Sequence, residues 1–223
     1  MVSRLATVTV GQAPRDDIVP EIVDRLHRDV EVTQYGVLDG LGLDDIAAMA
    51  PAADEARLCT RLKDGTEVIT SKAKTGERLS GLLTELTGNG YDQVVLLCTG
   101  YFDNIDCPRP YLEAQSLVDG YVAAISHGGR RIGVMVPNEA QIREAHIGEA
   151  KGHKGYEVAA VTHASPYSGD RLAEAARELS DMDVIVMHCM GYTRAHREAV
   201  AAASGRPAVL ARDVIAAGLD HLL

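Results

Sequence analysis

Aromatic side chains are scarce in this chain of 223 residues, which has no tryptophan and only one phenylalanine. Aliphatic side chains must therefore fill its core. Hydrophobic residues make up 46% of the chain and charged residues 24%, which is typical of a globular protein and argues against disorder. A chain of this length can bury a core without disulfide bonds, as one large domain or as two smaller lobes.

Long apolar runs and an excess of basic residues are also missing. No apolar run approaches the roughly 18 residues needed to span a bilayer. The net charge is −10, and an acidic chain is a poor binder of phosphate backbones. We therefore predict neither a membrane nor a nucleic acid as a partner. Residues 1–4 run directly into a strand-like segment, so we expect no signal or transit peptide and a cytoplasmic location.

The four cysteines form no Cys-x-x-Cys pair, which argues against a zinc ribbon or a thioredoxin-type redox pair. They are Cys59, Cys98, Cys107 and Cys189. Neither glycine-rich nucleotide-binding motif is present, and the eight histidines are scattered along the chain. We therefore predict no cofactor and no metal. Cys59 and Cys107 match no repeated motif and are interpreted as structural.

Apolar patterning predicts strands that alternate with helices along the whole chain, which favours a parallel α/β fold. Three continuous apolar runs are typical of strands buried on both faces of a sheet: 93–98, 131–136 and 183–187. Further strands are predicted at 5–10, 30–35, 156–161 and 207–210, with a hairpin at 57–70. Helices are predicted at 16–28, 44–49, 72–86, 110–125, 138–149, 170–179, 193–203 and 213–222.

Two of the buried strands end in the same way. Residues 96–101 read Leu-Leu-Cys-Thr-Gly-Tyr, and residues 187–192 read Met-His-Cys-Met-Gly-Tyr. This echo predicts a duplicated half, and hence two lobes in a parallel α/β fold. If pseudo-twofold symmetry relates the two parallel sheets, the two sulfurs face one another across the cleft between the lobes. We place lobe one at 1–105 and lobe two at 106–206, with 207–223 as a candidate return to lobe one.

Cys98 and Cys189 are predicted just past the carboxyl ends of strands, where ligands bind in open α/β sheets. Backbone N–H groups of the turn would favour the thiolate, and Gly100 and Gly191 permit a close approach. Two thiols on opposite sides of one carbon are equipped for inversion. One removes a proton next to a carboxylate as a thiolate, and the other delivers a proton to the opposite face. The alternative is that each cysteine is only a buried strand-end residue.

Other candidates for binding a small carboxylate lie in loops that follow strands. The loop at 11–15 either holds a carboxylate through backbone N–H groups and Arg15, or it merely caps the next helix. Asn138 is a ligand or an N-cap, and Arg109 either enters the cleft or pairs with surface acids. The run at 151–154 is interpreted as a solvated helix exit. The predicted binding residues are Gly11, Gln12, Pro14, Arg15, Thr99, Gly100, Arg109, Pro137, Asn138, Met190, Gly191 and Tyr192.

Four of these segments together resemble the AroM family, and the resemblance covers nearly the whole chain. They are 9–17 (Thr-Val-Gly-Gln-Ala-Pro-Arg-Asp-Asp), 98–100, 109–110 and 189–192. That family is similar to the aspartate/glutamate/hydantoin racemase superfamily. The resemblance implies two Rossmann-like lobes with the active site between them. It also implies cofactor-independent chemistry at the carbon next to a carboxylate, with one cysteine from each lobe, here Cys98 and Cys189.

Both cysteine motifs depart from those of the amino-acid racemases, which carry a Cys-Asn-Thr-like first motif and a Cys-Thr-like second one. Met190 replaces a hydroxyl that would bind a substrate carboxylate. The superfamily also contains decarboxylases, which can use a single cysteine, and cis–trans isomerases. We therefore predict a racemase, isomerase or lyase of this type that acts on a small carboxylate. A non-catalytic carboxylate-binding module is the alternative, a thiol-redox or scaffold role is a third hypothesis, and a homodimer is left open.

Overall fold

The computed structural model describes residues 2–103, 105–139, 141–143 and 154–223. The chain forms two compact units: unit 1 is Met1–Glu113 with Asp220–Leu223, and unit 2 is Ala114–Leu219. Each unit contains one four-stranded parallel sheet. The predicted α/β fold with two parallel sheets is therefore confirmed. The predicted lobe boundary between residues 105 and 106 stays a prediction.

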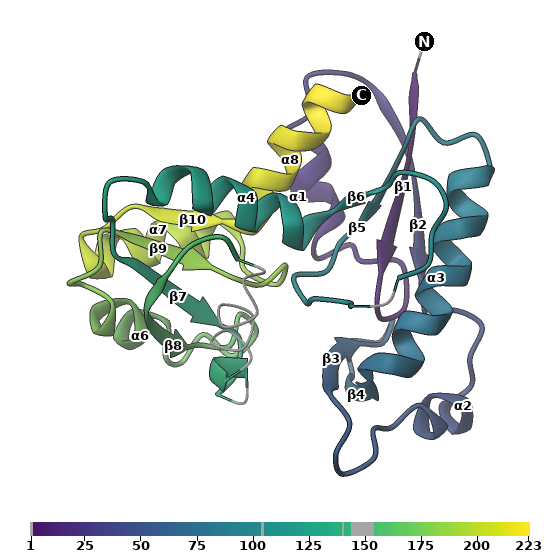
Figure 1. The fold of residues 1–223 in the computed structure, drawn as a ribbon, viewed down its shortest axis with the longest axis horizontal. Coiled ribbons are helices and arrows are strands. Elements are labelled where there is room, and N and C mark those ends of the chain that lie inside the picture. Colours follow the sequence, from purple (N-terminus) through teal and green to yellow (C-terminus); the bar gives the residue numbers. More distant parts are fainter. Residues whose placement is uncertain (1, 104, 140, 144–153) are drawn as a thin grey trace. The chain divides into compact units, whose positions relative to one another are not determined.

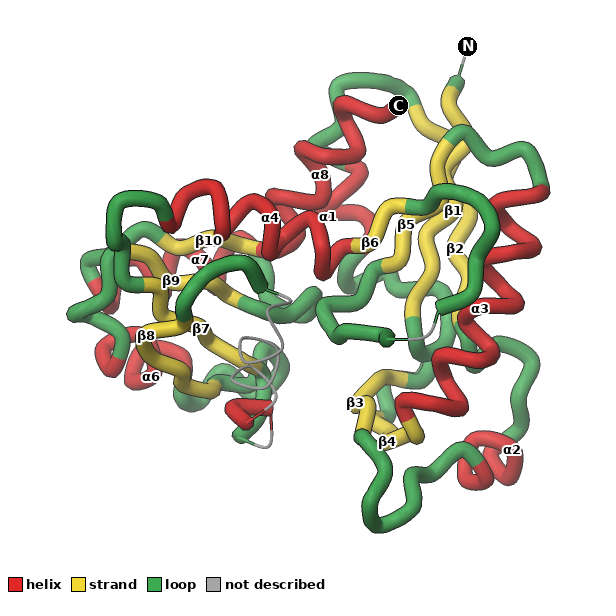
Figure 2. The backbone as a smooth tube through the Cα atoms, viewed as in Figure 1, coloured by secondary structure: helices red, strands yellow, loops and turns green. Residues whose placement is uncertain are grey.

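The sheet of unit 1 has the strand order β2-β1-β5-β6 (Figure 1). Its strands are β1 (Ser3–Thr9), β2 (Val30–Gly36), β5 (Gln93–Leu96) and β6 (Leu112–Glu113). Its helices are α1 (Val19–Val23), α2 (Leu43–Ala48) and α3 (Lys72–Gly88). The predicted hairpin is an antiparallel pair between α2 and α3 (Figure 2), formed by β3 (Arg57–Arg61) and β4 (Glu67–Ser71).

The two central strands of this sheet, β1 and β5, are largely buried on both faces, whereas β2 and β6 are mostly half-buried. Burial on both faces explains the unbroken apolar run of β5. Leu79 and Leu83 lie one turn apart on α3 and pack in one cluster with Val8 of β1 and Leu96 of β5. Val95 points to the opposite face of the sheet and is also fully buried. A strand with both faces covered has no solvent side on which polar residues would alternate.

The sheet of unit 2 has the strand order β10-β9-β7-β8. Its strands are β7 (Ile132–Val136), β8 (Val158–His163), β9 (Val184–Met187) and β10 (Ala208–Leu210). The described helices that carry residues of this unit are α4 (Ala114–Ser126), α6 (Leu172–Glu178), α7 (Arg194–Ser204) and α8 (Ala211–Leu222). The last turn of α8 belongs to unit 1, because that unit includes residues 220–223.

The two sheets repeat one topology. In each, the first strand is central, the second lies on one side of it, and the third and fourth lie on the other. The pairs β1–β5 and β7–β9 are therefore the points at which the strand order reverses. The Leu97 N–H donates to the Val8 carbonyl at 2.8 Å, and the His188 N–H donates to the Met135 carbonyl at 2.9 Å. In each sheet, an equivalent backbone hydrogen bond thus joins the third strand to the first at the residue just before the cysteine.

Two predicted helices differ from the structure. The helix predicted at 16–28 is only the five-residue α1. After it, the Arg25 and Leu26 N–H groups donate to carbonyls three residues back, and the His27 N–H donates to the Asp220 carboxylate at 2.7 Å. The helix predicted at 110–125 begins at Ala114, because residues 112–113 pair with β5 as the edge strand β6. Most of the helix predicted at 138–149 lies outside the described residues.

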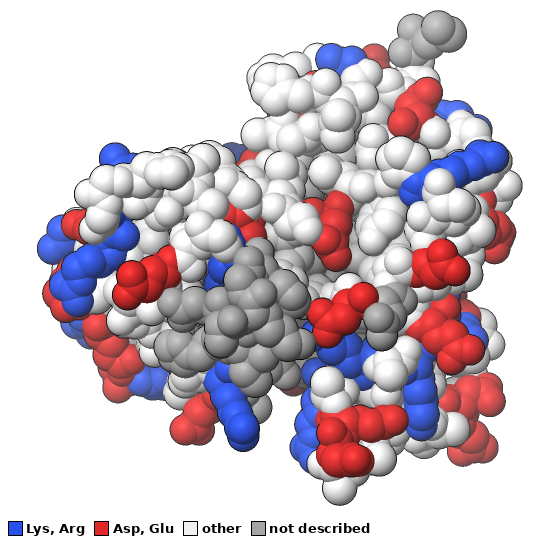
Figure 3. Space-filling view, in the orientation of Figure 1, with Lys and Arg blue, Asp and Glu red and all other residues white. Residues whose placement is uncertain are grey.

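No helix among the described residues is long and apolar enough to cross a bilayer. On the face drawn in Figure 3, acidic and basic side chains lie next to one another over α2 and the β3–β4 hairpin. The net negative charge of the chain is therefore not expressed there as a patch of one sign.

Candidate functional site

The two repeated cysteines lie at the carboxyl ends of equivalent strands, as the sequence predicts. Cys98 comes two residues after the end of β5, and Cys189 comes two residues after the end of β9. The Gly100 N–H donates to the Cys98 sulfur at 3.4 Å, and the Gly191 N–H donates to the Cys189 sulfur at 3.3 Å. Each sulfur therefore accepts a backbone hydrogen bond, which favours its thiolate form.

Cys98 is buried and belongs to the core of unit 1, with only 8% of its surface exposed. A Cβ at Gly100 would lie 3.5 Å from the Cys98 sulfur and 3.6 Å from Leu58, which is ordinary contact. Thr99 is half-buried. This turn thus has room to adjust around its sulfur.

The Cys189 turn is packed far more tightly. A Cβ at Gly191 would lie 2.7 Å from the Pro166 ring and 2.7 Å from the Tyr167 hydroxyl, so only glycine fits there. Tyr192 is fully buried, and its hydroxyl donates to the Ala164 carbonyl at 2.6 Å. Burial is the main cause that raises the pKa of the Tyr192 phenol, with the charge of Cys189 as the second. Met190 and Tyr192 are therefore both buried in this turn, and their role in binding stays a prediction.

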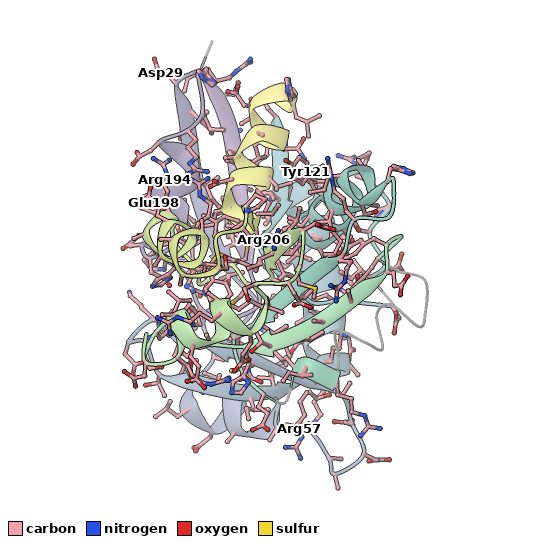
Figure 4. All side chains as sticks on the ribbon, turned by 90° about the vertical axis from the view of Figure 1, so that its left-hand side faces the viewer. Asp29, Arg57, Tyr121, Arg194, Glu198 and Arg206 are labelled. Carbon is pink, nitrogen blue, oxygen red and sulfur yellow. The ribbon has the colours of Figure 1, made fainter. Side chains whose placement is uncertain are left out.

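The Cys189 turn leads into α7, whereas no helix directly follows Cys98. Thr193 caps α7: its hydroxyl accepts from the His196 N–H at 3.3 Å, and its own N–H donates to the His196 ring at 3.1 Å. Arg194 and Glu198 follow one turn apart at the start of the helix (Figure 4). The positive end of the α7 dipole therefore lies beside the Cys189 turn and favours negative charge in its vicinity.

The loop at 11–15 uses its own donors to hold unit 1 together. Each backbone N–H of the loop has an acceptor, and Pro14 has none to offer. The hydrogen bonds run from Gly11 to Thr9 Oγ1 (3.4 Å), Gln12 to the Arg61 carbonyl (3.1 Å), Ala13 to Asp39 Oδ1 (2.9 Å) and Arg15 to Gln34 Oε1 (2.7 Å). The backbone donors of the loop are therefore used within unit 1, and carboxylate binding by this loop stays a prediction.

The side chains of this loop are engaged as well. Both nitrogens that Arg15 directs at Asp17 lie 2.8 Å from a carboxylate oxygen, which makes a bidentate pair. The Gln12 side-chain amide accepts from the Lys63 N–H at 3.0 Å and donates to the Leu38 carbonyl at 3.4 Å. Beside the loop is a small hollow whose lining includes Thr9, Ala13, Arg15 and Gln34. A Cβ at Gly11 would lie 2.2 Å from the Arg61 carbonyl, so glycine is required where the hairpin crosses.

The remaining three predicted residues are not brought to a cysteine by any contact in the described residues. Asn138 accepts from the Gln141 N–H at 3.2 Å, which is the N-cap role, and Pro137 is half-buried just before it. Arg109 is exposed and donates to the Thr87 carbonyl at 3.0 Å, at the C-terminal end of α3. That end of α3 leads into the beginning of β5, whereas Cys98 follows the other end of the same strand.

Sequence reasoning missed a buried polar cluster next to Cys189. His188 accepts from the Gln115 amide at 3.0 Å and lies 3.5 Å from the Lys154 ammonium. Lys154 lies 3.7 Å from Asp119, which also accepts from the Tyr156 hydroxyl at 3.0 Å. Burial, with the Lys154 charge as the second cause, holds the pKa of His188 well below its usual 6.5. The ring is therefore neutral, and its Nε2 is an acceptor.

Lys154 corrects the interpretation of 151–154 as a solvated helix exit, because it is only 2% exposed; residues 151–153 lie outside the described residues. One signal in the sequence could have found the cluster. His188 occupies the position that Leu97 has in the other copy of the repeat, and a polar residue in an apolar position implies buried partners. In the described part of the chain, no group of three or more His, Cys, Asp or Glu is placed to hold a metal ion.

Three solved structures share the fold of this chain at low sequence identity. Allantoin racemase from Klebsiella pneumoniae matches with a TM-score of 0.64 and 12% identity over 99% of this chain and 87% of its own. The maleate isomerase Iso from Pseudomonas putida S16 matches with a TM-score of 0.57 and 15% identity over 98% of this chain and 92% of its own. Arylmalonate decarboxylase matches with a TM-score of 0.57 and 15% identity over 97% of this chain and 92% of its own.

No curated protein sequence matches the chain at a significant level. A family model described as AroM protein matches residues 5–223. With the racemase structures, this match confirms the resemblance stated from the motifs.

Proposed function

The chain belongs to the AroM family, and from that premise we propose that it is a cofactor-independent racemase, isomerase or decarboxylase. Its substrate is a small acid, and the reaction takes place at the carbon next to the carboxylate. The observation that carries the proposal is the pair of equivalent turns at Cys98 and Cys189, each with a glycine N–H on the sulfur. A duplicated fold that retains a sulfur at both equivalent positions suits chemistry that needs two proton-transfer groups.

Each reaction of this set uses thiol chemistry that the two turns provide. In racemisation, one thiolate removes the α-proton and the other thiol protonates the opposite face of the carbanion. In decarboxylation, the C–C bond breaks to release CO₂, and one thiol protonates the carbanion that remains. In cis–trans isomerisation, a thiolate adds to an alkene carbon, the adjacent bond rotates, and elimination restores the thiolate. The three fold relatives are named for one reaction of each kind.

The substrate differs from a free α-amino acid in this proposal. Met190 has no hydroxyl to donate to a carboxylate, and it is 5% exposed. Thr99 is the hydroxyl-bearing neighbour of the other cysteine and is half-buried. We therefore place the substrate carboxylate at the Thr99 and Gly100 turn and not at Met190.

Solvent-deuterium exchange at the α-carbon tests the proposal. Each of a panel of small mono- and dicarboxylates is incubated with the protein in D₂O, and loss of the α-proton signal or appearance of product is followed by NMR. We expect exchange or turnover with at least one acid, and its loss in Cys98→Ser or Cys189→Ser, because a serine hydroxyl does not ionise near neutral pH. Cys59→Ser is the matched control and should retain activity.

A decarboxylase would tolerate the loss of one of the two cysteines but not of the other, so the two single variants separate this reaction from racemisation. Absence of exchange and turnover for every carboxylate that binds would overturn the enzyme proposal. The second candidate function, a module that binds a carboxylate without turnover, would then account for the fold. The motif Cys-Met-Gly favours that candidate, since it lacks the hydroxyl of the amino-acid racemases. Ligand-dependent thermal stabilisation would measure the binding.

A further inference from the structure

A buried arginine lies beneath the Cys189 turn. Arg212, the second residue of α8, is 1% exposed. Its Nε donates to the Met190 carbonyl at 2.6 Å, and one of its terminal nitrogens donates to the Gly191 carbonyl at 3.3 Å. A guanidinium without water around it is costly unless its donors are satisfied, so a buried arginine that contacts consecutive carbonyls fixes the turn strongly.

The Met190 carbonyl and the Gly191 N–H belong to the same peptide group. The carbonyl accepts from Arg212, and the N–H donates to the Cys189 sulfur at 3.3 Å. A cation that binds a peptide oxygen withdraws electron density from the group and makes its N–H a stronger donor. The effect is larger in a site shielded from water, because the local dielectric is low. The charge of Arg212 therefore acts on the cysteine sulfur through a single peptide unit.

The turn at Cys98 has the first half of this arrangement and lacks the second. The Gly100 N–H donates to the Cys98 sulfur at 3.4 Å. In the part of the chain that the structure describes, no arginine or lysine side chain is seen to donate to the Thr99 carbonyl, which belongs to the same peptide. Besides the tighter packing of the Cys189 turn and the α7 helix that follows it, the two turns thus differ in one buried cation.

Other charged groups near the Cys189 turn are already balanced by partners of their own. Lys154 faces Asp119, and His188, which adjoins Cys189 in the chain, is neutral because burial lowers its pKa. On α7 and α8, Arg197 pairs with Asp213. The phenol of Tyr192 is also neutral, since burial raises its pKa. Among the described residues, Arg212 donates to two carbonyls of the turn itself, and Arg194 follows the turn at the first position of α7.

We propose that Arg212 is a positioning residue for Cys189, because its guanidinium holds and polarises the Met190–Gly191 peptide whose N–H donates to the cysteine sulfur. It acts through that peptide and makes Cys189, rather than Cys98, the resting thiolate. In the reaction, Cys189 would then be the group that first takes a proton or attacks carbon. This assignment rests on the proposed function, but the state of the thiol can be measured without any substrate.

Iodoacetamide alkylation tests the proposal on the native protein. The rate at each cysteine is followed against pH by peptide mapping, and the midpoint of each profile gives the thiol pKa independently of steric access. We expect the Cys189 midpoint to lie below both that of Cys98 and the free value of about 8.5. Cys59 is the internal reference, since burial and the nearby Glu67 raise its pKa. A Cys189 midpoint at or above about 8.5, or above that of Cys98, overturns the proposal.

Two substitutions then assign the effect to Arg212. In Arg212→Met the cation is lost, and alkylation of Cys189 at pH 7 should slow about 3- to 10-fold while that of Cys98 is unchanged. In Arg212→Lys one charged donor remains, so the midpoint should lie between those of the native protein and Arg212→Met. The matched control is Arg206→Met. Arg206, labelled in Figure 4, also donates to a backbone carbonyl, that of Ser180 at 2.7 Å, away from the turn.

A folded Arg212→Met protein with an unchanged Cys189 midpoint overturns the proposal. If Arg212→Met shows no cooperative thermal transition, Arg212→Lys decides, and an unchanged midpoint there has the same meaning. Failure of the proposed function looks different. A low Cys189 midpoint that depends on Arg212, with no exchange for any carboxylate, would leave the role of Arg212 in place and remove the enzyme.

Discussion

The Gly191 backbone N–H donates to the Cys189 sulfur at 3.3 Å, and Gly191 itself is pressed against the ring of Pro166. The same donor geometry joins Gly100 to Cys98 at 3.4 Å, but without a tight neighbour. The two copies of the motif thus share the contact to sulfur and differ in how firmly the surrounding packing holds it. This difference makes the two glycines a natural matched pair for mutation.

Gly191→Ala should destabilise the protein by about 1–3 kcal/mol, because the new methyl group would lie 2.7 Å from the Pro166 ring, which cannot rotate away. Gly100→Ala should change stability by less than about 1 kcal/mol, since its nearest contacts are at 3.5 and 3.6 Å. Urea unfolding of both variants against the native protein measures the difference. Equal effects at the two positions would contradict the tight packing of the Cys189 turn.

The sequence predicted most of the fold because its signals are local. Continuous apolar runs identified β5, β7 and β9, and the repeated Cys-x-Gly-Tyr pattern predicted that two strands would end alike. The failures involve distant partners. Beyond the short α1, the His27 N–H is bound by Asp220, a residue far along the chain that no local pattern points to. The two-residue β6 is too short to leave a pattern of its own.

The candidate site divides in the same way. Glycine spacing after each strand correctly placed Cys98 and Cys189 at strand ends. Local sequence does not reveal which acceptor a given arginine will find. Arg15 has Asp17 two residues away, whereas Arg212 reaches carbonyls more than 20 residues back in the chain. The contacts of Arg212 form only when α8 packs beside the turn, so no local sequence motif predicts them.

The pairing of Arg15 leads to a prediction about the loop at 11–15. Arg15→Met should lower the free energy of unfolding by about 1–2 kcal/mol, because it removes a bidentate pair whose arginine side chain is only 11% exposed. It should leave the thermal stabilisation by small carboxylates unchanged, since the guanidinium is already occupied. Asp17→Asn is the control, and it should cost a similar amount. Loss of carboxylate binding in Arg15→Met alone would instead support the loop as an anion site.

The buried pair of Lys154 and Asp119 should be costly to break from either side. The Lys154 and Asp119 side chains are 1% and 3% exposed, so the loss of one partner leaves the charge of the other buried and uncompensated. Lys154→Met and Asp119→Leu should therefore each destabilise the protein by about 3–5 kcal/mol. The double variant should be less destabilised than the sum of the two, because neither charge then remains. Unfolding of the three variants in urea measures the coupling.

The exposed pair of Arg131 and Asp181 is the control for this cycle. Its side chains are 53% and 65% exposed, so Arg131→Met should cost less than about 1 kcal/mol. If the Lys154 and Asp119 variants cost no more than this control, the cluster is hydrated in solution and does not hold His188 neutral.

His188 makes the stability of the protein depend on pH. Burial first, and the Lys154 charge second, hold its pKa well below the usual 6.5 in the folded state, while the unfolded chain regains the usual value. Below about pH 6.5 the unfolded state therefore binds a proton that the folded state does not, and the free energy of unfolding falls as the pH drops. Gln115, Asp119, Lys154 and Tyr156 form the rest of this environment.

His188→Gln should therefore flatten the loss of stability between about pH 6.5 and pH 5, by up to about 1.4 kcal/mol per pH unit. The slope is the measured quantity, obtained from urea unfolding at several pH values, so a uniform destabilisation by the substitution does not affect it. His127→Gln, at an exposed position, is the control and should keep the native slope. If both variants keep that slope, His188 is protonated in the folded protein as readily as in the unfolded chain. The assignment of the His188 ring as a neutral acceptor that faces Gln115 and Lys154 would then be wrong.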